Sequence, residues 1–201
     1  MLKTAIVFIV DYLIGCMNGG LIYSKIFRHQ DIRKYGSGNA GSTNVLRVYG
    51  ILPALCVFAF DAIKGIIAMY ICYRVCGHDT LSMVLAAIGV ICGHNWPIFT
   101  NFKGGKGIAT TFGIALMLDW KVAMCAITLA MVILFITKLM SLGTLVAVLA
   151  GAIAVQVIPG ESAATRIIVP ILFLMTAYQH RGNIERLLNG KENKLDLGGG
   201  K

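Results

Sequence analysis

Long apolar runs alternate with short polar stretches along this chain of 201 residues. The pattern predicts seven helical segments: Thr4 to Phe27, Ile51 to Val75, Leu81 to Cys92, Ile108 to Leu118, Val122 to Thr137, Leu142 to Ile158 and Ile167 to Tyr178. A helix that crosses a bilayer needs about 20 apolar residues, or fewer where it is broken or re-entrant, so the third and fourth segments are short for full spans. The pattern therefore predicts an all-α polytopic membrane protein with about seven transmembrane helices, organised as one domain over residues 1–201.

The composition supports this class of protein. Hydrophobic residues make up 57% of the chain, charged residues only 13%, and the mean hydropathy is +0.78. These values leave too few polar residues to cover the surface of a soluble domain. The net charge of +9 would suggest a nucleic-acid partner in a soluble protein, but here it has to be interpreted first through membrane topology. We expect no nucleic-acid partner.

The distribution of Lys and Arg predicts the orientation. With the N-terminus outside, thirteen of the 18 basic residues fall on one side of the membrane, four fall on the other, and Lys64 lies within a span. Positive charge collects in cytoplasmic loops, so the C-terminus is predicted to be cytoplasmic. Lys3, the apolar run after it and Cys16 also look like a lipoprotein signal. Asp11 interrupts that run and the apolar pattern resumes at Leu21, which favours an uncleaved first span.

The first polar loop on the predicted cytoplasmic side is GSGNAGSTNVLR, from Gly36 to Arg47. Glycine lets backbone N–H groups converge on a phosphate, hydroxyl and amide side chains add neutral hydrogen bonds, and Arg47 offers a planar charged fork. The neutral hydrogen-bonding side chains are Ser37, Asn39, Ser42, Thr43 and Asn44. A flexible polar turn between two helices is the alternative. The glycines also fit a GxGxxG pattern, but no strand precedes them, which excludes a dinucleotide-binding fold.

A second cytoplasmic loop contains FKGGKG, whose charged and glycine positions are Lys103, Gly104, Gly105, Lys106 and Gly107. The lysines bring positive charge, and the glycines allow backbone N–H groups to approach an anion closely. A Walker motif is excluded because Gly107 stands where Ser or Thr is required. The alternative is a basic loop attracted to anionic lipid. His94 and Asn95, which come just before, favour a shaped ligand site.

Near the C-terminus, His180, Asn183 and Arg186 are spaced by three, which places them along one side of a helix. Histidine is the residue type whose ordinary pKa lies near neutral pH, so His180 is a candidate general base. Glu185 would lie roughly 140° around the helix from His180, so we do not pair the two as a catalytic dyad. A polar end of an amphipathic helix is the alternative.

Two other features lie in apolar segments. Asp61 and Lys64 in the second span are ionisable residues three positions apart, a spacing that favours a structural ion pair, with a proton or ion path as the rival. The six cysteines lie almost wholly in apolar segments without a CxxC pair, so we predict neither a metal site nor a disulfide.

The cytoplasmic segments together resemble those of the bacterial membrane-embedded acyl-phosphate:glycerol-3-phosphate acyltransferases. The resemblance runs through GSGNAGSTNVLR, GHNWPIFTNFKGGKGIAT and HRGNIERLLNGKENK, with DAIKG and SLG also similar to the family. It implies seven spans and an outward N-terminus, in agreement with the charge distribution. The chain departs from the family at Cys16-Met17-Asn18, where Ser-Ile-Pro is common, and at Ser42, where Ala is usual.

The resemblance implies transfer of an acyl group from acyl phosphate to the sn-1 hydroxyl of glycerol 3-phosphate. Lysophosphatidic acid and inorganic phosphate would form without an acyl-enzyme intermediate, a cofactor or a metal. The implied catalytic residues are Ser37, Lys103, His180 and Asn183. The implied substrate-binding residues are Gly38, Asn39, Gly41, Thr43, Asn44, Arg47, His94, Gly104, Gly105, Lys106, Ser141 and Arg186.

The same resemblance implies a place in the bacterial cytoplasmic membrane, with the active site on the cytoplasmic face and membrane lipid as a partner. A monomer is compatible with the sequence, which leaves the oligomeric state open. A transporter for an organic phosphate is the alternative function. Transporters bind near the bilayer midplane, often between repeated halves. The sequence shows no internal repeat, and only Asp61 and Lys64 favour transport. A scaffold for lipid-synthesis enzymes would not need glycine-rich anion loops.

Overall fold

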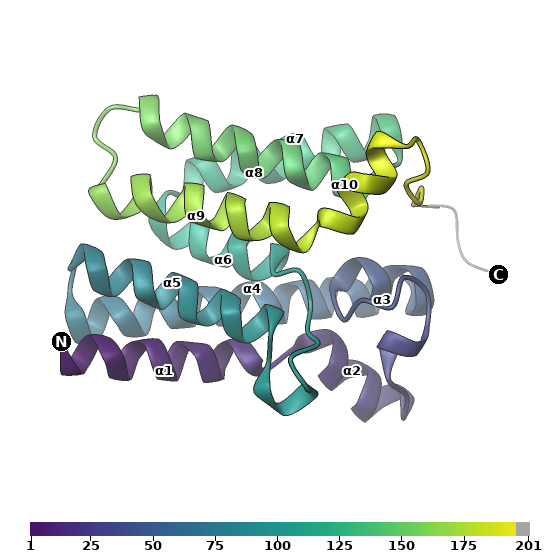
Figure 1. Ribbon diagram of the computed structural model, residues 1–201, viewed down its shortest axis with the longest axis horizontal. Coiled ribbons are helices and arrows are strands. Elements are labelled where there is room, and N and C mark those ends of the chain that lie inside the picture. Colours follow the sequence, from purple (N-terminus) through teal and green to yellow (C-terminus); the bar gives the residue numbers. More distant parts are fainter. Residues whose placement is uncertain (196–201) are drawn as a thin grey trace. The chain divides into compact units, whose positions relative to one another are not determined.

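A computed structural model describes residues 1–195, in which every regular element is a helix (Figure 1). In chain order the helices are α1 Leu2–Cys16, α2 Gly19–Arg28, η1 Ile32–Lys34, α3 Ser42–Tyr49, α4 Ile51–Cys76, α5 Thr80–Asn95, η2 Ile98–Thr100, α6 Ile108–Leu118, α7 Trp120–Thr137, α8 Met140–Val157, α9 Ala163–Gln179 and α10 Arg181–Leu188. This part of the chain divides into two compact units, residues 1–114 and residues 115–195. The organisation as one membrane domain stays a prediction.

Five helical segments in the described range are long and apolar enough to cross a membrane. They are Leu2–Arg28, Ile51–Cys76, Thr80–Thr100, Trp120–Thr137 and Met140–Val157, while Ile108–Leu118 and Ala163–Gln179 are shorter. The prediction of an all-helical, multi-pass membrane protein is confirmed. A count of seven spans and the orientation of the termini stay predictions.

In the first unit, α1, α4 and α5 lie side by side (Figure 1). Glycines bring α1 and α5 into backbone contact: a Cβ at Gly93 would overlap the Tyr12 carbonyl, and one at Gly15 would lie 2.9 Å from the Gly93 Cα. A Cβ at Gly89 would lie 2.8 Å from the Phe8 carbonyl. Lipid tails are as apolar as the side chains, so close packing of this kind is a main source of association between membrane helices.

The first apolar run is broken into two helices. α1 ends at Cys16 and α2 begins at Gly19, with Asn18 as its N-cap, where the Asn18 side chain accepts a 3.1 Å hydrogen bond from the Leu21 N–H. The apolar pattern continues across this point, and the sequence therefore predicted one continuous segment.

The predicted ion pair on α4 holds both sides of this break. Lys64 Nζ lies 2.8 Å from Asp61 Oδ1 and donates to the carbonyls of Gly15, at 3.1 Å, and Met17, at 2.9 Å. Asp61 Oδ1 accepts a 3.1 Å hydrogen bond from the Gly19 N–H. The ammonium thus lies at the carbonyl end of α1 and the carboxylate at the amide end of α2, the arrangement that the helix dipoles favour.

A small apolar core lies between α2, η1, α3 and α4. It contains Leu21, Ile32, Ala40, Val45, Ala54 and Val57. Ile32, Ala40 and Val45 are fully buried and lie in or beside the glycine segment. This core fixes the base of the first candidate anion loop.

In the second unit, α8 packs against both α7 and α9 (Figure 1). A Cβ at Gly143 would lie 2.5 Å from the Ala130 carbonyl, so α7 and α8 approach closely. The apolar core here is formed by Ala152, Val155 and Val169. α10 follows α9 with His180 as the residue between them.

Candidate active site

Asn44 organises the glycine segment from the inside. Its side chain is 2% exposed, and its Nδ2 donates to the carbonyls of Ile32, Tyr35 and Asn39 at 3.2, 3.0 and 2.9 Å. Its Oδ1 accepts a 2.7 Å hydrogen bond from the Ser37 N–H. The sequence indicated Asn44 as a substrate ligand. In the structure the Asn44 side-chain amide binds the backbone of the loop, so Asn44 positions the surrounding residues.

The glycines of this segment also serve the shape of the loop. Gly36 and Gly38 adopt left-handed conformations with φ of 58° and 74°, which side chains rarely adopt. The Gly38 N–H donates to the Tyr35 carbonyl at 3.0 Å, and the Gly41 N–H donates to the Asn39 side chain at 2.9 Å. Two of the expected anion donors, the Gly38 and Gly41 N–H groups, are therefore hydrogen-bonded inside this segment.

The second half of the segment is a helix that the sequence did not predict. α3 begins at Ser42, with Gly41 as its N-cap and Arg47 in its last turn. A helix N-terminus presents unpaired N–H groups and a partial positive charge, which suit a phosphate. The Ser37 side chain is exposed, and Thr43 in the first turn of α3 is partly exposed.

His94 lies in a buried polar cluster at the end of α5. Its Nδ1 is 2.8 Å from Lys64 Nζ, 3.5 Å from Thr110 Oγ1 and 3.7 Å from Asp61 Oδ1. An ammonium only donates, so Nδ1 accepts and the proton of a neutral ring lies on Nε2. The Nε2 edge faces Gly105, where any Cβ would overlap the ring. His94 therefore connects the α4 ion pair to the glycine loop.

The FKGGKG loop folds back onto the end of α5. The Gly105 N–H donates to the His94 carbonyl at 3.1 Å and the Gly104 N–H to the Asn95 carbonyl at 3.2 Å. A Cβ at Gly104 would overlap the His94 carbonyl. Lys103 is exposed at the edge of this loop. The glycines are thus required for packing against α5, and the loop presents the Lys103 side chain.

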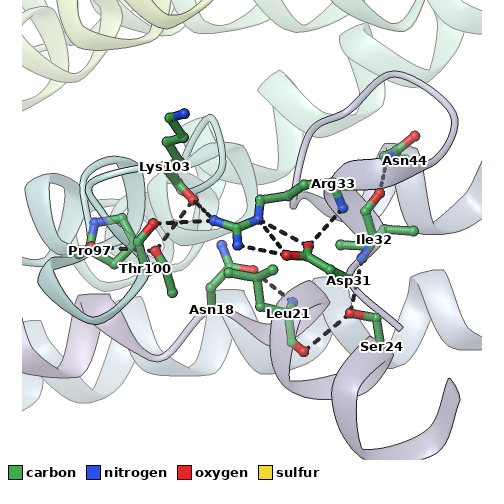
Figure 2. Close-up of polar contacts among 10 residues, drawn as sticks. All are labelled: Asn18, Leu21, Ser24, Asp31, Ile32, Arg33, Asn44, Pro97, Thr100 and Lys103. Carbon is green, nitrogen blue, oxygen red and sulfur yellow. Dashed lines mark hydrogen bonds and ion pairs between the residues drawn. The ribbon is translucent and has the colours of Figure 1, made fainter. Parts of the chain in front are cut away.

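Arg33, which the sequence indicates only as one of the cytoplasmic charges, links two loops. Its Nη1 donates to the carbonyls of Thr100 and Lys103 at 3.2 and 3.0 Å (Figure 2). These bonds join the segment before Gly36 to the FKGGKG loop. The structure thus brings together the two glycine-bearing loops, which the sequence indicated separately.

The remaining candidate residues lie in the second unit. His180 is buried, and its Nδ1 is 2.9 Å from the Thr176 carbonyl. A carbonyl oxygen only accepts, so Nδ1 carries the proton and Nε2 is the basic nitrogen of a neutral ring. This tautomer suits a base that acts through Nε2.

Glu192 brings Asn183 and Arg186 together. The Asn183 Nδ2 donates to Glu192 Oε1 at 2.6 Å, and the Arg186 Nε donates to Glu192 Oε2 at 2.9 Å. Glu192 was not predicted from the sequence, since it lies beyond α10 and no helical spacing links it to the other two. Ser141 is buried in the first turn of α8, and within residues 1–195 its Oγ has no hydrogen-bond partner.

These observations define an all-helical membrane protein that carries two linked glycine-rich loops and a His–Asn helix end. The family model for glycerol-3-phosphate acyltransferase matches residues 5–190. A glycerol-3-phosphate acyltransferase of Thermoanaerobacter sp. (strain X514) is 43% identical over 187 residues, which are 93% of each chain. One of Clostridioides difficile (strain 630) is 39% identical over 194 residues, 94% of each chain.

Comparison with solved structures indicates the same family. The crystal structure of PlsY (YgiH), an integral membrane glycerol 3-phosphate acyltransferase, in its glycerol 3-phosphate form, matches with a TM-score of 0.90 and 30% identity over 96% of each chain. Its lysophosphatidic acid form matches with a TM-score of 0.88 and 29% identity over the same shares. This chain belongs to the glycerol-3-phosphate acyltransferase family, as the resemblance predicted. It is therefore a multi-pass membrane acyltransferase of phospholipid synthesis.

Proposed function

We propose that this protein transfers an acyl group from acyl phosphate to the sn-1 hydroxyl of glycerol 3-phosphate. The products are lysophosphatidic acid and inorganic phosphate. One observation carries the proposal: two glycine-bearing loops lie beside each other, since Asn44 of the first binds the Ile32 carbonyl and Arg33, the next residue, binds the carbonyls of Thr100 and Lys103. Two such loops held at a fixed separation suit a reaction between two phosphorylated substrates, because both reactants are then held in a defined geometry. The family membership and the glycerol 3-phosphate form of the solved relative support the choice of acceptor.

The donor phosphate is held by the Gly36–Arg47 loop. The exposed Ser37 hydroxyl, the Asn39 backbone and the N-terminal turn of α3 with Thr43 supply neutral donors, and Arg47 supplies a charged fork. Asn44, together with the glycines at 36, 38 and 41, gives the loop its shape. An acyl phosphate is already an activated donor, so the loop has to bind and orient it and no enzyme nucleophile is required.

The acceptor is bound by Lys103, Ser141, His180 and Asn183, with Lys106 and Arg186 contributing to the phosphate contacts. Gly104 and Gly105 shape the loop that carries Lys103. The acceptor hydroxyl oxygen forms a bond to the acyl carbon, the bond from that carbon to the phosphate oxygen breaks, and phosphate leaves with its electron pair. The hydroxyl proton goes to the departing phosphate or to Nε2 of His180. Lys103 is exposed and charged, which suits the anionic acceptor.

The protein is proposed to span the bacterial cytoplasmic membrane seven times, with the N-terminus outside and the active site on the cytoplasmic face. The shorter helices α6 and α9 would complete the seven spans, since membrane-embedded helices can be short where they are tilted or packed inside the protein. The acyl chain would lie between helices, open to the bilayer.

The direct test uses purified protein in detergent or lipid with acyl phosphate and glycerol 3-phosphate. We expect inorganic phosphate and acylglycerol phosphate to form in equal amounts, with acyl-CoA and acyl carrier protein as comparison donors. Without the acceptor, a single-turnover experiment should show no burst of phosphate, since no acyl-enzyme forms. No product under any lipid condition would sink the donor assignment, and a burst equal to the enzyme concentration would exclude direct transfer.

The transporter alternative rested on Asp61 and Lys64. In the structure these residues bind the two ends of the α1–α2 break and His94. This contact set explains two buried charges in a span without transport, so no observation favours the transporter.

A further inference from the structure

Protein groups contact every nitrogen of the Arg33 guanidinium. Its Nε lies 3.0 and 3.2 Å from the two Asp31 carboxylate oxygens, and its Nη2 lies 2.7 Å from Asp31 Oδ2. On the other side, Nη1 donates to Thr100 and Lys103 carbonyls (Figure 2). All three nitrogens therefore have protein partners, and Arg33 is not arranged as a phosphate ligand.

The turn that Arg33 holds has an unusual backbone. Asn101 and Phe102 are consecutive non-glycine residues with φ of 55° and 57°. Such conformations are uncommon and persist where surrounding contacts impose them. The two carbonyls that Arg33 binds, those of Thr100 and Lys103, lie on either side of this strained pair. Arg33 thus holds the turn from which the Lys103 side chain leads away from the guanidinium (Figure 2).

The Asp31–Arg33 pair, called the clamp below, lies just before the Gly36–Arg47 loop. Asp31 Oδ1 caps η1 by accepting from the Arg33 N–H at 3.0 Å. The next residue, Ile32, is fully buried and gives its carbonyl to Asn44. The clamp therefore starts from a buried segment that Asn44 joins to the Gly36–Arg47 loop, and its other end binds the Lys103 turn.

The Asp31–Arg33 pair carries no net charge. Hydrogen bonds from Arg33 lower the pKa of the Asp31 carboxyl below its ordinary value, so both groups are charged at neutral pH and cancel. Because the pair is neutral, it does not attract an anionic substrate away from Lys103, and it does not repel that substrate.

We propose that Asp31 and Arg33 are positioning residues that hold the Lys103 turn at a fixed place relative to the Gly36–Arg47 loop. The inference rests on the proposed function, in which these two loops bind the acceptor and the donor. The clamp acts through Lys103 and touches neither substrate. By fixing the distance between the two phosphate-binding loops, the clamp fixes the direction from which the acceptor hydroxyl approaches the acyl carbon.

The first test compares Arg33→Lys and Asp31→Asn with Lys34→Gln, a matched control on an exposed residue of the same segment. A lysine donates from one point and cannot bridge the carboxylate and two carbonyls. We expect Arg33→Lys to lower kcat about 10- to 100-fold, the size of effect that a misplacement of about 1 Å produces. The KM for glycerol 3-phosphate should rise while the KM for acyl phosphate stays unchanged. Asp31→Asn should act in the same direction, and Lys34→Gln should match the wild type.

A double-mutant cycle with Lys103→Ala separates positioning from an independent role. If Arg33 acts through Lys103, then Arg33→Lys should cost little more once Lys103 is removed. Full additivity of the two losses would overturn the proposal. So would an equal rise in both KM values, since that would indicate direct contact with the donor.

Hydrogen exchange tests the clamp without any activity. The N–H groups of Phe102, Lys103, Gly104 and Gly105 donate to Pro97, Thr100, Asn95 and His94. These amides should exchange faster in Arg33→Lys and Asp31→Asn, but not in Lys34→Gln. Wild-type exchange in both clamp variants would refute the clamp. If the wild type fails to acylate glycerol 3-phosphate yet this exchange pattern holds, the proposed function fails and the clamp stands.

Discussion

Replacement of Lys64 by Met should destabilise the protein strongly. The ammonium contacts Asp61, two carbonyls at the helix break and His94 Nδ1, and the Lys64 and Asp61 side chains are only 5% and 2% exposed. Removing one partner of a buried pair costs about 3–5 kcal/mol because a buried charge is left unpaired, whereas an exposed pair is worth about 0–1 kcal/mol. At 5% and 2% exposure, Lys64 and Asp61 form a buried pair.

The assay is unfolding of the purified protein in a mild detergent, by heat or by titration with a denaturing detergent. Lys64→Met should lose about 3–5 kcal/mol, and the double variant Asp61→Asn with Lys64→Met should lose less, because no unpaired charge remains. Lys121→Met, at an exposed lysine, is the control. A loss below about 1 kcal/mol for Lys64→Met, or strict additivity in the double variant, would refute a structural role and revive the proton path.

The remaining predictions concern the loops and the base. Arg47→Lys keeps the charge but loses the bidentate fork, so the KM for acyl phosphate should rise about tenfold; full activity and donor affinity would move the donor site to the lysines. His180→Gln should lower kcat about 100-fold or more if His180 is the base, and a nearly unchanged turnover at saturating substrate would assign it to binding only. Gly36→Ala should lower the unfolding temperature and the donor affinity together, because its φ is 58° and the new Cβ would overlap Asn44; wild-type values for both would contradict the loop geometry.

The sequence predicted the helices well because apolar runs have clear ends. The predicted bounds of Ile108 to Leu118 are those of α6, and the other segments begin and end within a few residues of the structure. The helix break at Met17 and Asn18 was missed because its cause is tertiary: the partners that hold it lie on α4. α3 was missed because it is short and starts inside a polar, glycine-rich stretch.

The candidate loops were predicted from their composition, but the contacts that each residue makes within them were not. Whether Asn44 binds a ligand or its own backbone depends on which carbonyls the folded loop brings within reach. Arg33 looked like one of many cytoplasmic charges, since nothing local shows that its partners are the carbonyls of Thr100 and Lys103. The residue types predicted that these loops could bind anions. Which residue contacts a ligand and which holds the backbone is determined by long-range contacts in the folded protein.

The ion pair on α4 also bears on how the protein assembles in the membrane. Asp61 and Lys64 are one turn apart, so they can neutralise each other while α4 is still an isolated helix in lipid. This pairing lowers the cost of placing the two charges in lipid, and in the folded protein Lys64 also binds the carbonyls of Gly15 and Met17. In a two-stage view, in which helices insert first and associate later, we expect the same two charges to ease the first stage and to contribute contacts in the second.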